Sequence, residues 1–174
     1  MSGLRILVSA ASAHGSTEVI AEEIGSALTG HGFDVTVLPP AQVASVDEYD
    51  AFVIGSAVYS GHWLAPAKDL VDRFGGVLGR RPVWLFSSGP VGKPGGRLAR
   101  SMARDPIELP AVRSVTRARE HRIFAGDLDP KSLTGPQRVG FAVFPSLKGD
   151  FRDWGAVRQW SDAIAADLWA LARS

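Results

Sequence analysis

The sequence contains no cysteine, and this absence excludes several kinds of chemistry. Without thiols the chain has no disulfides, no thiolate zinc site, no cysteine-ligated iron–sulfur cluster and no cysteine nucleophile. The four histidines show no metal-ligand spacing such as His-Glu-x-x-His. Gly-x-Ser-x-Gly, which marks the nucleophile of many hydrolases, is also missing. We therefore predict no metal site and name no catalytic side chain.

An excess of charge of one sign and long apolar runs are missing as well. Nineteen basic residues face 18 acidic ones, for a net charge of +1, whereas nucleic-acid binders are usually markedly basic. The longest uncharged stretch, 51–67, is interrupted by glycine, serine, histidine and proline, which does not suit a membrane span. The amino terminus lacks the pattern of a signal peptide. These features predict a cytoplasmic protein without a nucleic-acid partner.

The composition is that of an ordinary globular domain. The chain has 174 residues, of which 45% are hydrophobic and 21% charged, and this length fits one domain. No repeat or linker divides it. We predict a single domain over residues 1–174, with an arginine-rich elaboration at about 93–122.

Apolar runs of strand length alternate with helical patterns, which is typical of an α/β fold. Continuous apolar runs indicate parallel strands that are covered on both faces. The predicted strands are 4–11, 33–38, 50–57, 82–88 and 122–125. Helices are predicted after Ser16 or Thr17, either of which is a suitable N-cap, from Pro66, and over about 153–172. The pattern predicts a doubly wound parallel sheet with helices on both faces.

A short polar loop, Ser12–Thr17, follows the first predicted strand. It offers three hydroxyl groups, one glycine and the backbone N–H groups of a helix start, which together can hold a phosphate. It has no lysine and no Gly-x-Gly-x-x-Gly, so it is neither a Walker A loop nor a dinucleotide fingerprint. The alternative is that the loop only caps the helix.

Two further loops follow predicted strands, and parallel strands bring such loops to one edge of the sheet. The loop 56–63 combines small residues with Tyr59, His62 and Trp63, and the loop 87–92 is small and polar. Hydroxyl groups at one loop and aromatic and glycine residues at the next suit a planar ring that carries a phosphorylated chain. Trp63 is expected to pack in the interior.

The first loop resembles the FMN-phosphate loop of flavodoxins, which has a Ser/Thr-x-x-Gly-x-Thr pattern. The sequences 55–63, 124–126 and 149–154 are similar to those of the quinone-linked, oxygen-independent protoporphyrinogen oxidases and related flavodoxin-domain proteins. The resemblance implies a flavodoxin-like doubly wound sandwich with a five-stranded parallel sheet, strand order 2-1-3-4-5, and FMN as cofactor.

The resemblance also implies roles for individual residues. The FMN phosphate would be held by Ser12, His14, Gly15, Ser16 and Thr17. The flavin ring would be bordered by Ala57, Val58, Tyr59, Ser60 and Gly61, and its pyrimidine side by Ser88, Gly89 and Gly92. For His14 the alternative is an ordinary solvated loop residue. Shuttle flavodoxins differ from this chain in two respects, since they are strongly acidic and carry an aromatic residue in the third loop. Because the third loop has no aromatic residue here, one face of the flavin is expected to be open, or to be covered by Trp154 or by the middle segment.

The middle segment, 93–122, carries eight basic and three acidic residues. Arg97, Arg100 and Arg104 have the spacing of one helical face. Arginine pairs well with carboxylates, so this segment is a candidate docking surface for a carboxylated substrate or for anionic lipid headgroups. The alternative is an ordinary solvated surface.

These observations and the resemblance lead to one preferred function and three alternatives. The preferred function is an FMN-dependent oxidoreductase resembling the menaquinone-dependent protoporphyrinogen oxidases of heme biosynthesis, with a small-molecule redox substrate and a quinone acceptor. The alternatives are an electron carrier without its own substrate, a binding module that has lost the flavin, and a quinone reductase that uses NAD(P)H. Both a monomer and a homodimer fit the sequence.

Overall fold

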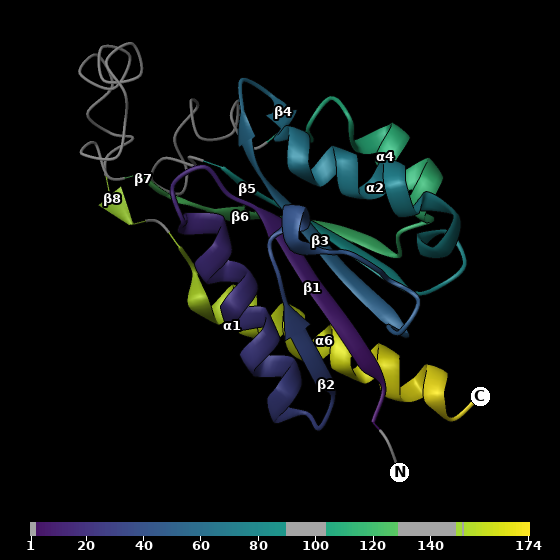
Figure 1. The fold of residues 1–174 in the computed structure, drawn as a ribbon. Helices are drawn as coiled ribbons and strands as arrows, with labels where there is room; N and C mark the ends of the chain where they lie inside the picture. Colours follow the sequence, from purple (N-terminus) through teal and green to yellow (C-terminus); the bar gives the residue numbers. More distant parts are fainter. Residues whose placement is uncertain (1–2, 90–103, 129–148, 151) are drawn as a thin grey trace.

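Five parallel strands form the central sheet of the protein. The computed structural model describes residues 3–89, 104–128, 149–150 and 152–174. The sheet has the order β2-β1-β3-β5-β6 (Figure 1). Its strands are β1 (Arg5–Ala11), β2 (Asp34–Val37), β3 (Ala51–Tyr59), β5 (Val83–Gly89) and β6 (Glu120–Ala125). Counted along these five strands, the order is 2-1-3-4-5, which confirms the predicted doubly wound topology.

One short antiparallel pairing extends this sheet, and a second one forms a separate two-stranded sheet. β4 (His62–Trp63) folds back on the end of β3, where the sequence analysis predicted an open loop, so that prediction was wrong. The turn between them has positive φ at Ser60 (50°) and Gly61 (81°), which is the backbone of a two-residue hairpin whose twist matches its strands. β7 (Asp127–Leu128) pairs with β8 (Gly149–Asp150).

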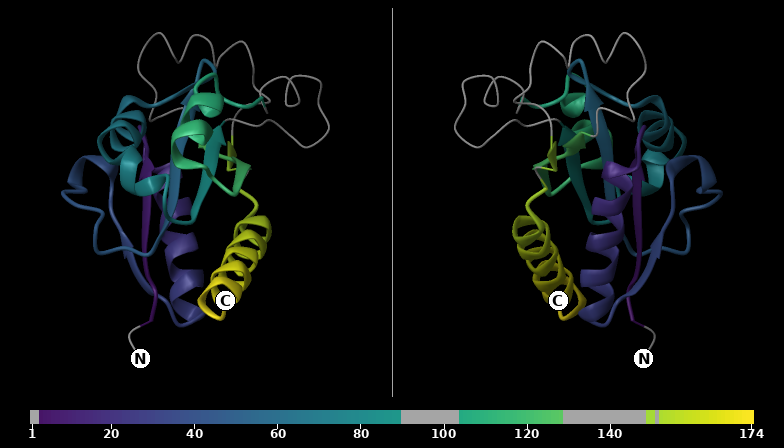
Figure 2. Two further views of the ribbon diagram at one scale, coloured as in Figure 1. Left: turned by 90° about the vertical axis from the view of Figure 1, so that its right-hand side faces the viewer. Right: turned by 90° about the vertical axis from the view of Figure 1, so that its left-hand side faces the viewer.

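Helices cover both faces of the sheet (Figure 2). α1 (Ser16–Gly30) and α6 (Trp154–Ala172) lie on one face, and α2 (Ala65–Leu78) and α4 (Leu109–Thr116) lie on the other. The short 3₁₀ helix η1 (Pro40–Gln42) contacts α2. None of the helices in the described ranges has the length and apolar character needed to cross a bilayer.

Helix ends follow local rules, with one departure from the prediction. Asp153 Oδ1 accepts a hydrogen bond from the Ala156 N–H at 3.0 Å and so caps α6. Pro66 lies in the first turn of α2, where its missing N–H has no consequence. The N-cap of α1 is Gly15, not Ser16 or Thr17, because the chain enters this helix through a left-handed residue.

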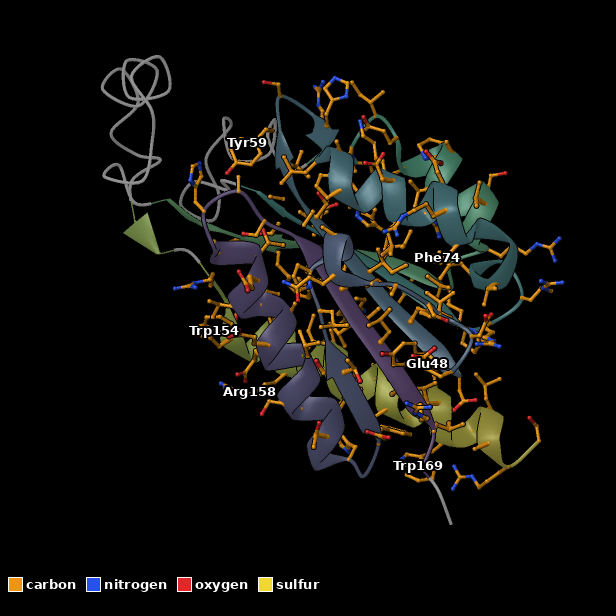
Figure 3. The ribbon with its side chains drawn as sticks, in the orientation of Figure 1. Glu48, Tyr59, Phe74, Trp154, Arg158 and Trp169 are labelled. Atoms are coloured by element: carbon orange, nitrogen blue, oxygen red, sulfur yellow. The ribbon has the colours of Figure 1, made fainter. Side chains whose placement is uncertain are left out.

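The core under α1 and α6 is apolar and aromatic. The rings of Phe86, Phe124 and Trp160 pack with centroids 5.5 to 6.2 Å apart. Gly55 on β3 makes room for one of them, since a Cβ there would lie 2.3 Å from the Phe86 ring. Trp154 packs against the margin of this core. In Figure 3 Trp154 lies well away from Tyr59, so it does not cover the edge of the sheet that carries the three loops.

On the opposite face, two arginines fix the connection between β2 and β3. Arg73 donates to the carbonyls of Pro40 and Val43 at 3.0 and 3.2 Å. Arg81 donates to the carbonyls of Val46 and Asp47, both at 3.0 Å, and to that of Tyr49. These bonds satisfy backbone acceptors of a segment whose only regular structure is the short helix η1. Both cations therefore act in the fold and are not free for a ligand.

Candidate functional site

The sheet register brings the ends of β1, β3 and β5 to one edge. Ala11 lies opposite Ser56, and Ala57 lies opposite Ser88. Figure 3 places Tyr59 at this edge, far from Glu48 and Trp169 at the other end of the molecule. Ligands of doubly wound folds bind at the carboxyl edge, where the strand order reverses. The three loops singled out in the sequence therefore begin side by side.

The first loop has the backbone shape of an anion cradle. Gly15 adopts φ 86° and ψ −14°, and its carbonyl accepts the hydrogen bond of Val19 N–H at 3.1 Å. The Ser12 Oγ accepts the Gly15 N–H at 2.9 Å, which holds the loop in a closed curve. Among the described residues, apart from its two chain neighbours, no atom lies within 4 Å of a Cβ built on Gly15. The helix start thus brings first-turn N–H groups and the positive end of the helix dipole to this loop.

Side chains around this cradle differ in exposure. His14 is exposed, Ser12, Gly15 and Ser16 are partly buried, and Thr17 is buried. The ring of His14 lies edge-on to that of Tyr59, with centroids 6.2 Å apart, so the first and second loops are neighbours. Burial raises the pKa of the Tyr59 hydroxyl above its ordinary value, which keeps that group protonated and able to donate a hydrogen bond.

The second loop is the hairpin of β3 and β4. Val58 and Tyr59 are partly buried, Ser60 and Gly61 are exposed at the turn, and Ala57 is buried. The Gly61 carbonyl accepts a hydrogen bond from the Ile107 N–H at 2.9 Å. Trp63 is 2% exposed, which confirms that it packs in the interior. The turn is therefore exposed at the edge of the sheet, and the hydrogen bond from Ile107 fixes its backbone.

At the third loop, Ser88 is buried and Gly89 is partly buried. The Gly89 carbonyl accepts a hydrogen bond from the Gly126 N–H at 2.7 Å, so the end of β5 is tied to the end of β6. Gly92 lies outside the described residues.

Glu108 connects the hairpin to α2. Its Oε1 lies 2.7 Å from His62 Nδ1 and 3.3 Å from Lys68 Nζ, and its Oε2 accepts the Trp63 N–H at 3.1 Å. Burial would raise the pKa of Glu108, but the hydrogen bonds from His62, the Trp63 and Glu108 backbone N–H groups and Lys68 outweigh it and lower this pKa to about 2. Glu108 is thus an acceptor only, so His62 Nδ1 carries the proton in their bond.

A second polar network lies under the hairpin, in the interior. Trp63 Nε1 donates to Ser87 Oγ at 2.8 Å, and Ser87 Oγ lies 2.8 Å from His121 Nε2. Asp105 Oδ1 lies 3.3 Å from His121 Nδ1. Burial, reinforced by Arg113, lowers the pKa of His121 against the opposing effect of Asp105. The neutral imidazole therefore donates from Nδ1 to Asp105 and accepts the Ser87 hydroxyl proton at Nε2.

This network has the atom order of a hydrolase triad, yet it is structural. Ser87 is 1% exposed, and its Oγ already accepts the indole N–H of Trp63, so no substrate can reach it. The sequence analysis found neither this network nor the role of Glu108. The partners are separated by 16 to 46 residues along the chain, and no local motif connects them.

Arginines of the middle segment are only partly described. Arg104 is exposed and lies in an irregular stretch before α4, so the prediction of one helical face is wrong at that position. Arg97 and Arg100 lie outside the described residues. The described arginines of the segment are all exposed on the surface; they are Arg104, Arg113, Arg117, Arg119 and Arg122.

Two cavities of the described structure are not lined by residues of the Ser12–Thr17 loop. One of about 80 Å³ is lined by Glu18 and Glu22 together with residues of β1, α1 and the end of β2, and its carboxylates would repel a phosphate. Another of about 140 Å³ lies between α2 and α4 and is bordered by Glu108. In the described part of the chain, no three histidine, aspartate or glutamate side chains gather closely enough to hold a metal ion.

Solved structures with a similar fold include several flavodoxins. A flavodoxin from the domain Archaea aligns over 95% of this chain and 99% of its own, with a TM-score of 0.63 and 17% identity. A WrbA-like flavodoxin from Agrobacterium tumefaciens aligns over 97% and 99%, with a TM-score of 0.59 and 11% identity. Rubredoxin oxygen:oxidoreductase from Desulfovibrio gigas gives a TM-score of 0.66 and 11% identity over 99% of this chain, which spans only 38% of that protein. These likenesses establish the fold.

The sequence itself assigns the family. No curated protein sequence gives a significant match. The family model "Flavodoxin domain" matches residues 7–153, a range that includes all three loops at the carboxyl edge and most of the chain. The protein is a member of the flavodoxin-domain family.

Proposed function

We propose that the protein is an FMN-dependent oxidoreductase that binds the FMN phosphate in the Ser12–Thr17 loop and the flavin ring beside the β3–β4 hairpin. Membership of the flavodoxin-domain family supports this. The observation that carries it is the cradle at Gly15, where a left-handed glycine leads into the first turn of α1 and Ser12 holds the curve. When bound, FMN would supply the hydride or electron transfer.

The chain's own groups have separate tasks in this proposal. First-turn N–H groups and the hydroxyls of Ser12, Ser16 and Thr17 would bind the phosphate without a lysine. Backbone groups of 57–61 and 88–89 would border the ring, and His14 and Tyr59, which contact each other, would close the space between the two loops. No side chain is required as an acid or base.

The electron partner is proposed from charge. The exposed arginines of 104–122 favour a substrate with carboxylates, and we propose a porphyrinogen with propionate groups as the donor and a quinone as the acceptor. Charge reversal at Arg104, together with Arg97 and Arg100, is then expected to raise the KM for the porphyrinogen. An unchanged KM with weaker binding to anionic vesicles would instead assign the segment to membrane contact.

A carrier function is the second candidate. The similar structures include proteins described as flavodoxins, which favours an electron carrier without a substrate of its own. Turnover of protoporphyrinogen with a menaquinone analogue separates the two. Multiple turnovers support the oxidoreductase, and reduction of the bound flavin without turnover supports the carrier.

Comparison of FMN with riboflavin tests the proposed site, because the two differ only in the phosphate. We expect one FMN per chain, with riboflavin binding at least about tenfold weaker, as the loss of charge-assisted hydrogen bonds implies. Ser12→Ala should weaken FMN binding and leave riboflavin binding unchanged. Equal affinities for the two flavins would contradict the phosphate cradle, and failure to bind either would remove the cofactor.

A further inference from the structure

Ile107 and Glu108, the two residues before α4, form hydrogen bonds with the β3–β4 hairpin. Ile107 N–H donates to the Gly61 carbonyl at 2.9 Å. One residue later, the Glu108 carboxylate binds the two residues that follow Gly61. It accepts from His62 Nδ1 at 2.7 Å and from the Trp63 N–H at 3.1 Å. Three consecutive hairpin residues are thus bound by two consecutive residues of another segment, which we call the 107–108 clamp.

Such a clamp has a physical purpose at this turn. Ser60 and Gly61 both have positive φ, and both residues are exposed. A two-stranded hairpin of this length is not stable without support. The support comes from Glu108, whose side chain is 18% exposed. Its two oxygens bind different groups: Oε1 binds the His62 ring and the Lys68 ammonium group, and Oε2 binds the backbone. Lys68 on α2 fixes the same carboxylate at 3.3 Å.

We propose that Glu108 is a positioning residue for the Ser60–Gly61 turn and, through it, for the ring side of the flavin site. The proposal rests on the proposed function, because the turn borders the flavin only if FMN binds at this edge. It assigns Glu108 to ring binding and leaves phosphate binding to the cradle around Gly15. The two halves of the site should therefore respond to different substitutions.

Glu108→Ala and Glu108→Gln test this assignment when FMN and riboflavin affinities are measured together. In Glu108→Ala both flavins should bind about tenfold more weakly, the loss expected for charge-assisted hydrogen bonds that hold the turn. The ratio of the two affinities should stay at the wild-type value, and the absorbance of bound flavin should shift. Glu108→Gln retains an oxygen for the Trp63 N–H and should recover part of the affinity. Ser12→Ala, by contrast, should weaken the binding of FMN alone and so change the ratio of the two affinities.

Glu23→Gln is the matched control, because Glu23 is also a partly buried carboxylate in a 3.1 Å ion pair, with Arg158, but lies on the other face of the sheet. It should leave both affinities unchanged. Lower stability of Glu108→Ala with unchanged flavin affinities would overturn the proposal, since a purely structural role predicts that result. A change in the affinity ratio would also overturn it.

Amide hydrogen exchange in the flavin-free protein provides a readout that does not need the cofactor. Exchange at the Trp63 and Ile107 amides should accelerate in Glu108→Ala and not in Glu23→Gln. Unchanged exchange at both amides would refute the clamp even if FMN binds. If the wild type binds no flavin but exchange accelerates, the clamp holds the turn, the proposed function fails and the assignment to ring binding fails with it.

Discussion

The face of the sheet under α1 and α6 and the face under α2 and α4 bury different kinds of side chain. Under α1 and α6, the packing of Phe86, Phe124 and Trp160 joins the sheet to the helices, and the hydrogen bond from Trp160 to Glu120 lies at the margin, where Glu120 is 40% exposed. Under α2 and α4, the apolar core is joined by the interior network of Trp63, Ser87 and His121.

This difference separates stability from positioning. Apolar contacts have no preferred direction and stabilise the fold in proportion to the area buried. Hydrogen-bonded networks contribute less net free energy, but they fix the orientation of each partner. The face with the polar network is the one that supports the hairpin at the carboxyl edge. We infer that the first face mainly stabilises the domain and the second mainly shapes the site.

Substitution of Phe86 should have the largest effect on the first face. Phe86→Ala should lower the free energy of unfolding by about 3–5 kcal/mol, because it removes a fully buried ring from the aromatic cluster. The flavin affinity of the folded fraction should stay within about twofold, a change of less than 0.5 kcal/mol. Urea unfolding and a flavin titration measure the two quantities. A large loss of affinity at full folding would show that the two faces are coupled.

Two buried serines sharpen the comparison within the sheet. Ser87→Ala should cost about 1–3 kcal/mol, because it leaves Trp63 Nε1 and His121 Nε2 without their shared partner. Ser9 is equally buried, yet its Oγ has no hydrogen-bond partner among the described residues. Ser9→Ala should therefore be neutral or slightly stabilising in the same urea measurement. Equal costs for the two variants would contradict the structural role of the network.

The two ends of α1 offer a smaller test. Gly15→Ala should cost about 1–2 kcal/mol, because an L residue is strained at φ 86°, and it should also reduce the preference for FMN over riboflavin. Gly30 is the last residue of the helix, and in the described part of the chain, apart from its chain neighbours, no atom outside this helix lies within 4 Å of a Cβ built there. Gly30→Ala should be neutral or stabilise by up to about 1 kcal/mol. Strain at both positions would argue against the left-handed cap.

The smallest effect that we expect is the contribution of His121 to the pH dependence of stability. The pKa of His121 is lowered in the folded protein, so its contribution to stability is present above the unfolded pKa of about 6.5 and is lost as the pH falls below it. His121→Gln should flatten this part of the curve of unfolding free energy against pH. If the unfolding free energy of the wild type increased as the pH fell from 6.5 to 5, this result would contradict a neutral His121 imidazole.

Most of the fold could be predicted because its signals are local. Buried parallel strands are continuous apolar runs, and the helices show their periodicity, so the five strands of the parallel sheet were found from these patterns. Their order was implied by the resemblance to flavodoxins. The predicted N-cap of α1 was wrong because the loop enters the helix through a left-handed glycine, and this conformation depends on the whole turn. β4 was missed because Ser60-Gly61 is a weaker hairpin signal than Asn-Gly.

The support of the site could not be predicted, since it depends on contacts between distant segments. His62 and Glu108 are separated by 46 residues, and only the sheet order places them together. The loops themselves were identifiable because small and hydroxyl residues follow each strand. Sequence reasoning therefore finds the residues that would touch a ligand more readily than those that hold them in place.

The most direct measurement of the central claim is a titration of the ¹⁵N-labelled protein with FMN, followed by NMR. The account predicts that FMN shifts the amides of Gly15, Thr17, Gly61 and Gly89, and that riboflavin shifts the last two but not the first two. The amides of Asp34 and Asp50, at the opposite edge of the sheet, should not move. Shifts confined to the opposite edge, or no shifts at saturating FMN, would contradict the assignment of this edge as a flavin site.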